Sequence, residues 1–407
     1  MARKSAKPST VSEGKAGSKP TRKRPTQSQA ASAKLSEPST HPALTPVIGL
    51  GASAGGLQAF TDFFEAMPDK SGMAFVAIYH VDPDHKSLMA DLLSKHTNMT
   101  VEMAVDQTVV KPDHVYIIPP KEFLLIENGI LRLIAPLEPR GLRLPIDLFF
   151  RSLAADQQQK AVAIILSGTG SDGSAGIRSI KENGGMVLVQ DPKDATHDGM
   201  PRSAIATGSV DHILPVAKMP EVISDFMAHP YMKNASTTKV LGEKARGLLS
   251  EIIKVLKAHT PINFEYYKEG TLLRRIERRM ALHHFESSTD YLALLKNSPD
   301  EAEKLCSDLL ICVTSFFRDP EAFNYLADHV IRDLVVNCAP GKSIRIWVPA
   351  CATGEEAYSL AITVEQAMKA EGLEPRYGIV GTDISREAIF QARRGIYRES
   401  KMTSIDQ

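Results

Sequence analysis

The stretch Val47–Phe60, VIGLGASAGGLQAF, decides the fold of the chain that follows it. An apolar run leads into a glycine-rich turn, and apolar residues at helical spacing follow the turn. This order predicts a buried strand, a sharp turn and a helix, which together make the first unit of an open α/β sheet. The spacing Gly51-x-Ser53-x-Gly55 is that of a nucleophile elbow, in which such a turn lifts a serine hydroxyl to the carboxyl edge of the sheet.

The same letters also fit a dinucleotide-binding fingerprint, G-x-G-x-x-A, at Gly49, Gly51 and Ala54. A dinucleotide site usually ends its second strand with an acidic residue that holds the ribose. The second predicted strand, Met73–Tyr79, ends instead in His80. A histidine at that place can act as a general base toward a serine on the neighbouring strand, so the pattern favours hydrolysis. A dehydrogenase is the weaker alternative.

Charge and composition separate a basic N-terminal segment from the rest of the 407 residues. Residues 1–45 hold nine Lys or Arg, two Glu and almost no large apolar side chain, which predicts a disordered basic tail. A nucleic-acid-binding arm is the disfavoured alternative. The sequence has no run of 18 apolar residues and no apolar leader, so a cytoplasmic protein without membrane insertion is expected. The four cysteines lack metal-ligand spacing, and no metal site is predicted.

Five regions follow from the pattern along the chain. Residues 1–45 are the tail, and residues 46–218 alternate strand and helix patterns, which predicts a doubly wound, mostly parallel sheet. Within this domain, Asn128-Gly129 predicts a type I′ hairpin. Residues 219–244 are predicted to be a linker, 245–337 a small all-helical domain, and 338–407 an incomplete Rossmann-like domain.

Three predicted strands of the α/β domain are followed by reactive side chains, Ser53, His80 and Asp172. Because the carboxyl ends of parallel strands meet at one edge of a sheet, we expect these side chains to converge. The hypothesis makes Ser53 the nucleophile, His80 the general base and then acid, and Asp172 the residue that orients His80. Backbone N–H groups of the glycine-rich turn 167–176 would face a developing oxyanion.

Ordinary structural roles compete with these assignments. Ser53 and Asp172 both stand where a residue commonly caps a helix. Four other residues could replace His80 or Asp172 in the hypothesis: His85, Asp82, Asp84 and Asp191. A lone G-x-S-x-G is a weak signal, but three reactive residues that each end a buried strand favour catalysis.

Residues 46–216 resemble the catalytic domain of the CheB-type chemotaxis protein-glutamate methylesterases. The matching stretches are IGLGASAGG (48–56), IYHVDPDHKS (78–87), VYIIPP (115–120), ILSGTGSDGSAGI (165–177) and DGMPRSAI (198–205). The resemblance implies a catalytic triad of Ser53, His80 and Asp172, with the backbone amide of Thr169 in the oxyanion site. It implies hydrolysis of glutamate γ-methyl esters on the helices of methyl-accepting chemoreceptors, without a cofactor, and glutamine deamidation as a further reaction to test.

Two departures from the family pattern qualify this expectation. Ala54 stands where the family often has threonine, so the esterase is expected to be slower if that hydroxyl assists the oxyanion. The family usually carries an N-terminal phosphoacceptor receiver domain, and the basic tail takes that place here. Control by phosphorylation within this chain is therefore not expected.

A second group of residues lies beyond the linker. TLLRRIERRM (271–280) places Arg274, Arg275, Arg278 and Arg279 at helical spacing, and a solvated helix face is the ordinary interpretation. Farther along, Asp383 ends a predicted strand, where its carboxylate suits ribose hydroxyls. A purely structural aspartate is the alternative.

Residues 258–397 resemble the start of the CheR-type chemotaxis receptor methyltransferases, which use S-adenosylmethionine. The matching stretches are INFEYYKEGTLLRRIERRM (262–280), VTSFFRDPEAF (313–323), CATGEEAYSLA (351–361) and GTDISREAI (381–389). The resemblance implies that the four arginines dock on acidic receptor helices and that four residues contact the cofactor: Thr314, Arg318, Glu355 and Asp383. About two strands of the methyltransferase sheet are matched, so we expect no methyl transfer by this chain and a poorly ordered C-terminal region.

The sequence thus predicts a serine esterase joined to an incomplete methyltransferase. The alternative from another class is a non-catalytic chemosensory scaffold that binds receptor helices. The complete set of Ser53, His80 and Asp172 argues against it, because a scaffold has no need of all three.

Overall fold

The computed structural model describes residues 45–80, 88–135, 144–232, 235–310, 314–338, 342–374 and 376–397. The predicted basic tail therefore lies outside the described residues, apart from residue 45. So do three of the alternative site residues, His85, Asp82 and Asp84.

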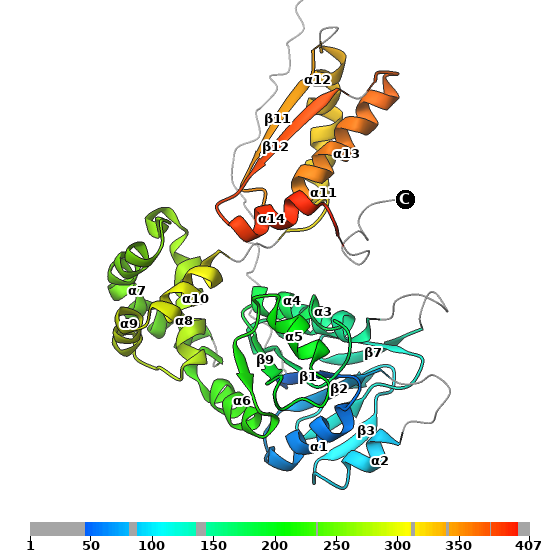
Figure 1. The fold of residues 1–407 in the computed structure, drawn as a ribbon, viewed down its shortest axis with the longest axis vertical. Helices are drawn as coiled ribbons and strands as arrows, with labels where there is room; N and C mark the ends of the chain where they lie inside the picture. The colour runs from blue at the N-terminus through cyan, green and yellow to red at the C-terminus, as the bar shows by residue number, and fades with distance from the viewer. Residues whose placement is uncertain are drawn as a thin grey trace, which may run out of the picture. The chain divides into compact units, whose positions relative to one another are not determined.

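A seven-stranded sheet is the centre of the first domain, and every pair of neighbouring strands in it is parallel (Figure 1). The strand order is β10-β9-β8-β1-β2-β5-β3. The strands are β1 (Val47–Ala52), β2 (Ala74–Tyr79), β3 (Thr100–Met103), β5 (His114–Ile117), β8 (Val162–Ile165), β9 (Met186–Gln190) and β10 (His212–Leu214). The chain begins in the middle of the sheet at β1 and builds outward on both sides, which confirms the predicted doubly wound parallel fold.

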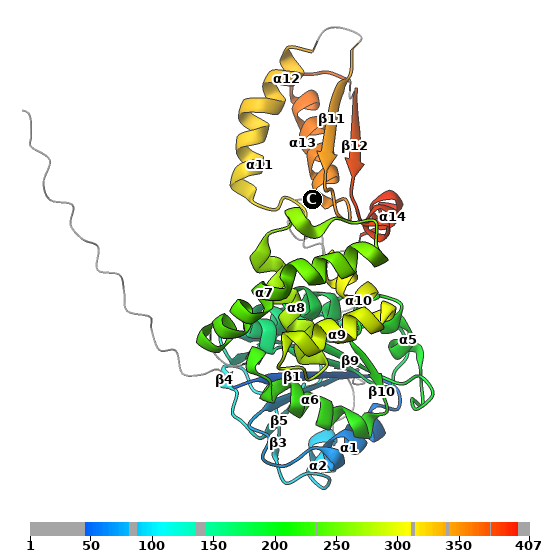
Figure 2. The same ribbon diagram turned by 90° about the vertical axis from the view of Figure 1, so that its left-hand side faces the viewer.

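Helices cover both faces of this sheet (Figure 2). One face packs against α1 (Gly56–Ala66), α2 (Met89–Leu93) and α6 (Met219–Ala228). The other packs against α3 (Pro145–Gln157), α4 (Gly176–Glu182) and α5 (Gly199–Ile205). Because both faces are covered, the central strands are apolar on both sides, which explains the continuous apolar runs of the sequence.

A three-stranded antiparallel sheet packs beside α3 and contains β4 (Thr108–Val109), β6 (Phe123–Glu127) and β7 (Ile130–Ile134). Asn128 and Gly129 between β6 and β7 both have positive φ, 53° and 72°. Positive φ at both central residues defines the type I′ turn that the sequence predicts.

The two glycines of the dinucleotide fingerprint serve helix packing. A Cβ on Gly49 would lie 2.8 Å from Cε1 of Phe150, and a Cβ on Gly51 would lie 2.5 Å from Cγ2 of Ile146. Both contacts are to α3, which therefore rests on the bare backbone of β1. This packing accounts for the glycines without a bound dinucleotide.

The predicted linker, residues 219–244, is wrong in both halves, since residues 235–244 already belong to the helix Ala235–His259. Residues 219–228 form α6, and its buried side chains Met219, Ile223 and Phe226 belong to the core beneath the parallel sheet. These apolar residues have helical spacing, but the helix is short and polar residues flank it, so the periodic pattern is weak in the sequence. The α/β domain therefore extends beyond the predicted boundary at residue 218.

An all-helical region follows, as predicted, but its predicted end at residue 337 is wrong, because Ile331 and Val335 belong to the core of the C-terminal region. It contains α7 (Ala235–His259), α8 (Glu269–Leu282), α9 (Ser288–Asn297) and α10 (Pro299–Leu309) around a core of its own.

Short 3-10 turns occur before this region, at Gln158–Lys160, Val216–Lys218 and Pro230–Met232, and within it at Phe264–Tyr266.

The C-terminal region contains two parallel strands, β11 (Ile344–Pro349) and β12 (Tyr377–Thr382), on either side of α13 (Glu355–Ala370) in the sequence. The other helices are α11 (Pro320–Leu326), a π-helical turn (Ala327–Ile331), α12 (Arg332–Val336) and α14 (Arg386–Arg394). One face of the strand pair packs on α13, and Trp347 and Val380 are exposed. The predicted strand–turn–helix–strand order is confirmed.

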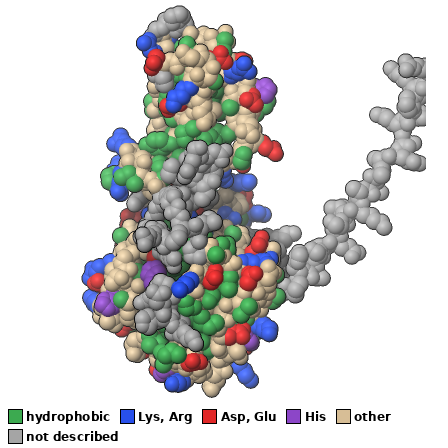
Figure 3. All heavy atoms as spheres, turned by 90° about the vertical axis from the view of Figure 1, so that its right-hand side faces the viewer, with side chains coloured by type: hydrophobic (Ala, Val, Ile, Leu, Met, Phe, Trp, Pro, Cys, Tyr) green, Lys and Arg blue, Asp and Glu red, His purple; other side chains and the backbone are tan. Residues whose placement is uncertain are grey.

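The described surface carries charges of both signs. Figure 3 shows Lys or Arg side chains interspersed with Asp or Glu side chains over one face, with hydrophobic side chains between them.

We expect Gly51→Ala to lower the free energy of unfolding by about 1–3 kcal/mol, because the added methyl group must push α3 away from β1. Chemical denaturation of the full chain measures the change. Gly247→Ala is the control: Gly247 lies in α7 with open space around its Cα, so alanine should be neutral or stabilising there. Equal effects of the two substitutions would contradict the close packing.

Candidate active site

The turn that follows β1 places Ser53 at the carboxyl edge of the parallel sheet. Gly55 adopts a left-handed conformation with φ of 76°, which lets the chain reverse sharply into α1. Ser53 N–H donates to the carbonyl O of Ser167 at 3.0 Å, which ties the turn to the end of β8. Within the described residues, no side chain caps α1, so the helix-capping alternative for Ser53 is not supported.

His80 and Asp172 follow the strands on either side of β1, namely β2 and β8. His80 Nδ1 lies 3.1 Å from Ser53 Oγ, and His80 Nε2 lies 3.1 Å from Asp172 Oδ2. The side chain of Asp172 is 2% exposed, and that of His80 is 35% exposed. The structure therefore brings together the three residues that the sequence predicts to converge.

Three backbone N–H groups fix the Asp172 carboxylate. Ile146 N–H donates to Oδ2 at 3.0 Å, and Asp147 and Gly173 N–H donate to Oδ1 at 2.9 and 2.8 Å. Ile146 and Asp147 belong to the first turn of α3, where unpaired N–H groups favour an anion. Asp172 thus binds the start of α3, which comes before it in the chain. The same carboxylate also contacts His80 Nε2.

The arrangement has the hydrogen-bond logic of a serine hydrolase. The His80 tautomer with its proton on Nε2 can donate that proton to the Asp172 carboxylate, and its Nδ1 lone pair then faces Ser53 Oγ and can take the hydroxyl proton. In the best-known serine proteases Nε2 faces the serine and Nδ1 the aspartate. The exchange of the two ring nitrogens leaves the chemistry unchanged, because either nitrogen can act as the base.

The other sequence candidates lie at different places. Thr169 is exposed in the turn between β8 and Asp172, and within the described residues its N–H donates no hydrogen bond. Asp191 lies after β9, where its Oδ1 accepts Lys193 N–H at 2.9 Å in a local turn. Of the residues that the structure describes, His80 and Asp172 are therefore the ones that meet Ser53.

Sequence reasoning missed three buried polar residues around Ser53, His80 and Asp172. Asp147 Oδ1 accepts the N–H groups of Ala175 and Gly176 at 2.8 and 2.7 Å, so Asp147 caps α4. Gln190 Oε1 accepts Ser167 N–H at 2.8 Å. Ser167 stands in the glycine-rich turn and could have been singled out there. Asp147 and Gln190 give no local signal, because their partners are more than 20 residues away.

Known proteins are similar to this chain over its α/β domain, its helical region and its C-terminal region. Residues 48–223 match the family model of the CheB methylesterases. A putative protein-glutamate methylesterase/protein-glutamine glutaminase of Leptospira interrogans is 34% identical over 176 residues, which are 43% of this chain and 91% of that protein. The chain belongs to the CheB methylesterase family. Residues 248–310 and 312–407 match two CheR methyltransferase models, the all-alpha domain and the SAM-binding domain.

Two longer proteins and one solved structure are also similar to this chain. An uncharacterised 104.1 kDa protein of Rhodobacter capsulatus is 40% identical over 332 residues, which are 77% of this chain and 35% of that protein. The chain spans about half the length of a protein-glutamate methylesterase/protein-glutamine glutaminase of Photorhabdus laumondii, at 35% identity over 178 residues and 42% of this chain. The crystal structure of the Thermotoga maritima CheB methylesterase catalytic domain aligns with 30% identity and a TM-score of 0.41, over 44% of this chain and 97% of that one.

In the CheR-like region, Glu355 and Asp383 border the turn after β11. Glu355 is fully buried and accepts the hydroxyl of Thr353 at 2.5 Å. Asp383 Oδ2 accepts Ala352 N–H at 2.9 Å, and its Oδ1 accepts Ser385 N–H at 2.8 Å. The carboxylates of two predicted cofactor residues thus lie at the carboxyl ends of β11 and β12.

The other two predicted cofactor residues, Thr314 and Arg318, lie on the segment before α11. This segment rests on α13, since Phe317 N–H donates to Ser359 Oγ at 2.9 Å. Arg318 is exposed and Thr314 partly exposed. The structure places their segment against the same helix that begins with Glu355.

The predicted receptor-docking face on α8 is wrong for three of its four arginines. Arg274 is exposed, whereas Arg275, Arg278 and Arg279 are at most 5% exposed. Helical spacing showed that these side chains share one side of the helix. It could not show that this side packs within the chain.

Arg278 is held by two buried carboxylates of the chain. Its Nη1 lies 2.8 Å from Asp308 Oδ2, and its Nη2 lies 2.5 Å from Asp211 Oδ2. All three side chains are 0% exposed, and the guanidinium also donates to the carbonyl O of Gly185 at 2.7 Å. A buried charge of this kind requires such pairing, because desolvation alone would strongly disfavour it.

Arg275 caps the carboxyl end of α4 in the methylesterase domain. Its guanidinium donates to the carbonyl oxygens of Lys181 and Glu182, both at 2.9 Å. A cation at a helix carboxyl end is favoured by the partial negative charge of the last carbonyl groups. In addition, Lys181 Nζ lies 2.9 Å from Asp308 Oδ1, so α4 and α10 are joined directly.

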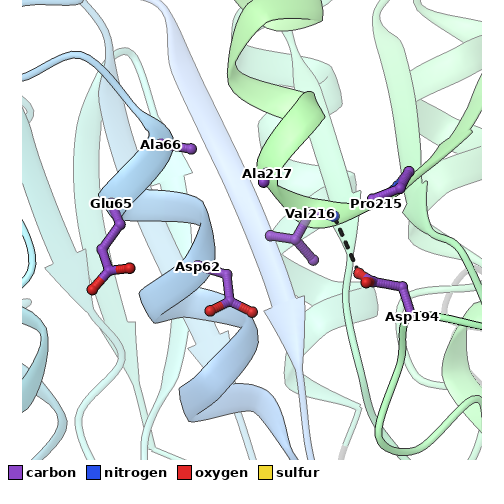
Figure 4. A pocket seen from close by; sticks show the side chains of 7 residues that line it. All are labelled: Asp62, Glu65, Ala66, Asp194, Pro215, Val216 and Ala217. Atoms are coloured by element: carbon purple, nitrogen blue, oxygen red, sulfur yellow. Dashed lines mark hydrogen bonds between the residues drawn. The ribbon is translucent and has the colours of Figure 1, made fainter.

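A hollow of about 360 Å³ lies beside α1 (Figure 4). It is lined by Asp62, Glu65, Ala66, Asp194, Pro215, Val216 and Ala217. Asp194 Oδ2 accepts Val216 N–H at 3.3 Å, which joins two parts of the wall. Ser53, His80 and Asp172 are not among the residues that line this hollow. Within the described ranges, no group of three His, Cys, Asp or Glu side chains could hold a metal ion, and no helix is long and apolar enough to span a bilayer.

We expect Arg278→Met to lower the free energy of unfolding by up to about 3–5 kcal/mol, because the buried carboxylates of Asp211 and Asp308 lose their guanidinium partner and keep only weaker pairing with Lys181 and Arg279. Chemical denaturation followed by circular dichroism measures the change. Arg202→Met is the matched control: Arg202 pairs with Asp198 on the surface, where the loss should stay below about 1 kcal/mol. A small effect of Arg278→Met, equal to that of the control, would contradict the buried pairing.

The helical region should also be acid-sensitive through Glu301. Burial raises the pKa of Glu301, but hydrogen bonds from His283 and Arg279 outweigh it and lower this pKa to about 2. An unfolded glutamate has a pKa of about 4.3, so ionised Glu301 stabilises the fold above that pH, and the stabilisation is lost as the pH falls toward 2.

Unfolding free energies measured between about pH 5.5 and 2.5 should therefore fall less steeply for Glu301→Gln than for the unaltered chain. Glu303→Gln, at an exposed position in the same helix, should keep the steep fall. The same slope in all three proteins would refute the role of Glu301.

Proposed function

We propose that this chain is a protein-glutamate methylesterase that hydrolyses glutamate γ-methyl esters on chemoreceptor helices, with Ser53 as its nucleophile. The observation that carries the proposal is the hydrogen-bonded series Ser53 Oγ, His80, Asp172 at one sheet edge. Membership of the CheB methylesterase family supports the substrate class. A cytoplasmic location and receptor helices as partners belong to the same proposal.

In the first step, His80 Nδ1 takes the proton of Ser53 Oγ while Oγ attacks the ester carbonyl carbon. Asp172 accepts a hydrogen bond from the Nε2 proton of the resulting His80 imidazolium and thereby stabilises it. The Thr169 N–H is the proposed donor to the tetrahedral oxyanion. His80 then returns the proton to the departing methoxide, so methanol leaves and an acyl-enzyme remains.

In the second step, His80 removes a proton from water, and the hydroxide attacks the acyl-enzyme. The intermediate collapses, Ser53 regains its proton from His80, and a free glutamate carboxylate is released. With a glutamine side chain as substrate, the first leaving group is ammonia in place of methanol. The same residues would then act as a glutaminase.

For the CheR-like region, we infer that Glu355, Asp383, Thr314 and Arg318 would hold S-adenosylmethionine. Each oxygen of Asp383 accepts one backbone N–H and keeps a lone pair for a ribose hydroxyl, so Asp383 fits the nucleoside part of the cofactor. When bound, S-adenosylmethionine supplies an electrophilic methyl group. The acidic residues at the strand ends would orient the nucleoside.

We expect Ser53→Ala to abolish methanol release from a methylated chemoreceptor, by at least about a thousandfold, because no other group can form the acyl-enzyme. The assay compares the full chain with the variant. Ser224→Ala, which removes a hydroxyl from α6, is the control and should keep the full rate. Equal, negligible release from the unaltered chain and Ser53→Ala would favour the scaffold alternative.

A further inference from the structure

Ser167 lies between the end of β8 and the turn that carries Ser53, and it is 1% exposed. Its carbonyl O accepts Ser53 N–H at 3.0 Å, and its Oγ donates to the carbonyl O of Ala54 at 2.9 Å. We propose that Ser167 is a positioning residue, whose hydroxyl holds the nucleophile turn in the conformation that aims Ser53 Oγ at His80. The kinetic part of this inference rests on the proposed function.

The hydroxyl of Ser167 has a defined direction. Its Oγ accepts His197 N–H at 3.0 Å, so the single hydroxyl proton must go to a carbonyl oxygen. The carbonyl of Ala54 is 2.9 Å away and that of His197 is 3.4 Å away, which favours Ala54. The Ser167 backbone is itself fixed, because its N–H donates to buried Gln190.

Three successive peptide units of the nucleophile turn are held in this way. The N–H of Ser53 is bound to the Ser167 carbonyl, and the carbonyl of Ser53 accepts Gly56 N–H at 2.9 Å. The third unit, with the Ala54 carbonyl, is held by the Ser167 hydroxyl. The first two bonds involve backbone only, so the third alone depends on a side chain.

Loss of the hydroxyl would release the third peptide unit. Ser167→Ala removes the partner of the Ala54 carbonyl and of the His197 N–H, but leaves the backbone bond to Ser53 in place. The turn could then rotate about Ala54 and Gly55, where left-handed glycine already allows wide freedom. A displacement of about 1 Å at a nucleophile is enough to slow a reaction on the order of a hundredfold.

The test uses the full chain in four forms: unaltered, Ser167→Ala, Ser167→Thr and Ser152→Ala. Threonine keeps the hydroxyl that the proposal requires. Ser152 is the matched control, because its Oγ also joins two backbone groups, accepting Ile126 N–H at 3.1 Å and donating to the Phe149 carbonyl at 2.8 Å. These partners belong to β6 and α3, apart from the nucleophile turn.

Methanol release from a methylated chemoreceptor gives kcat and KM for each form. Ser167→Ala should lower kcat roughly tenfold to a hundredfold at unchanged KM. Ser167→Thr should recover most of the rate, and Ser152→Ala should keep it. Full kcat in Ser167→Ala, an equal loss in Ser152→Ala, or no recovery in Ser167→Thr would each overturn the proposal.

Amide hydrogen exchange supplies a readout that needs no activity. Exchange over residues 53–56 should accelerate in Ser167→Ala while the rest of the sheet stays protected, and Ser152→Ala should leave residues 53–56 unchanged. If the unaltered chain releases no methanol, the proposed function fails, but the exchange comparison still decides about Ser167. Unchanged exchange over the turn in Ser167→Ala would overturn its positioning role.

Discussion

The close approach of α3 to β1 is the constraint on which the candidate site depends. Glycines 49 and 51 leave the backbone of β1 bare, so α3 can rest on it with Ile146 and Phe150 in contact. That approach brings the first N–H groups of α3 to the Asp172 carboxylate. A carboxylate fixed by backbone donors can hold a histidine in one orientation, and the order of the strands puts that histidine beside Ser53.

The two ends of α4 in the methylesterase domain bind side chains of opposite charge. At its start, Asp147 accepts the free N–H groups of the helix, close to the turn that carries Asp172. At its end, the Arg275 guanidinium donates hydrogen bonds to the last carbonyl groups of the helix, and Arg278 pairs with Asp211 nearby. The helical region is therefore bound to the methylesterase domain by buried charges, which need fixed partners to be tolerated.

Buried polar residues that take no part in the proposed reaction support the candidate site. Ser167 and Gln190 form a buried layer behind the nucleophile turn, and each satisfies backbone groups that would otherwise be unpaired. Such a layer supports a turn that contains a left-handed glycine and holds Ser53 Oγ 3.1 Å from His80 Nδ1. Rigid supports of this kind are what pre-organise a reactive group.

The sequence by itself determined the doubly wound sheet and the hairpin at Asn128-Gly129, and it predicted Ser53, His80 and Asp172 as the leading candidates to meet at one sheet edge. Each of these follows from local signals, namely apolar periodicity, turn chemistry and the residue that ends a strand. Only the tertiary structure decided that three arginines of α8 are buried and that α6 belongs to the core of the α/β domain. Helical periodicity shows which side chains share a face, but whether that face meets water or a carboxylate such as Asp211 depends on chain segments about 67 residues away.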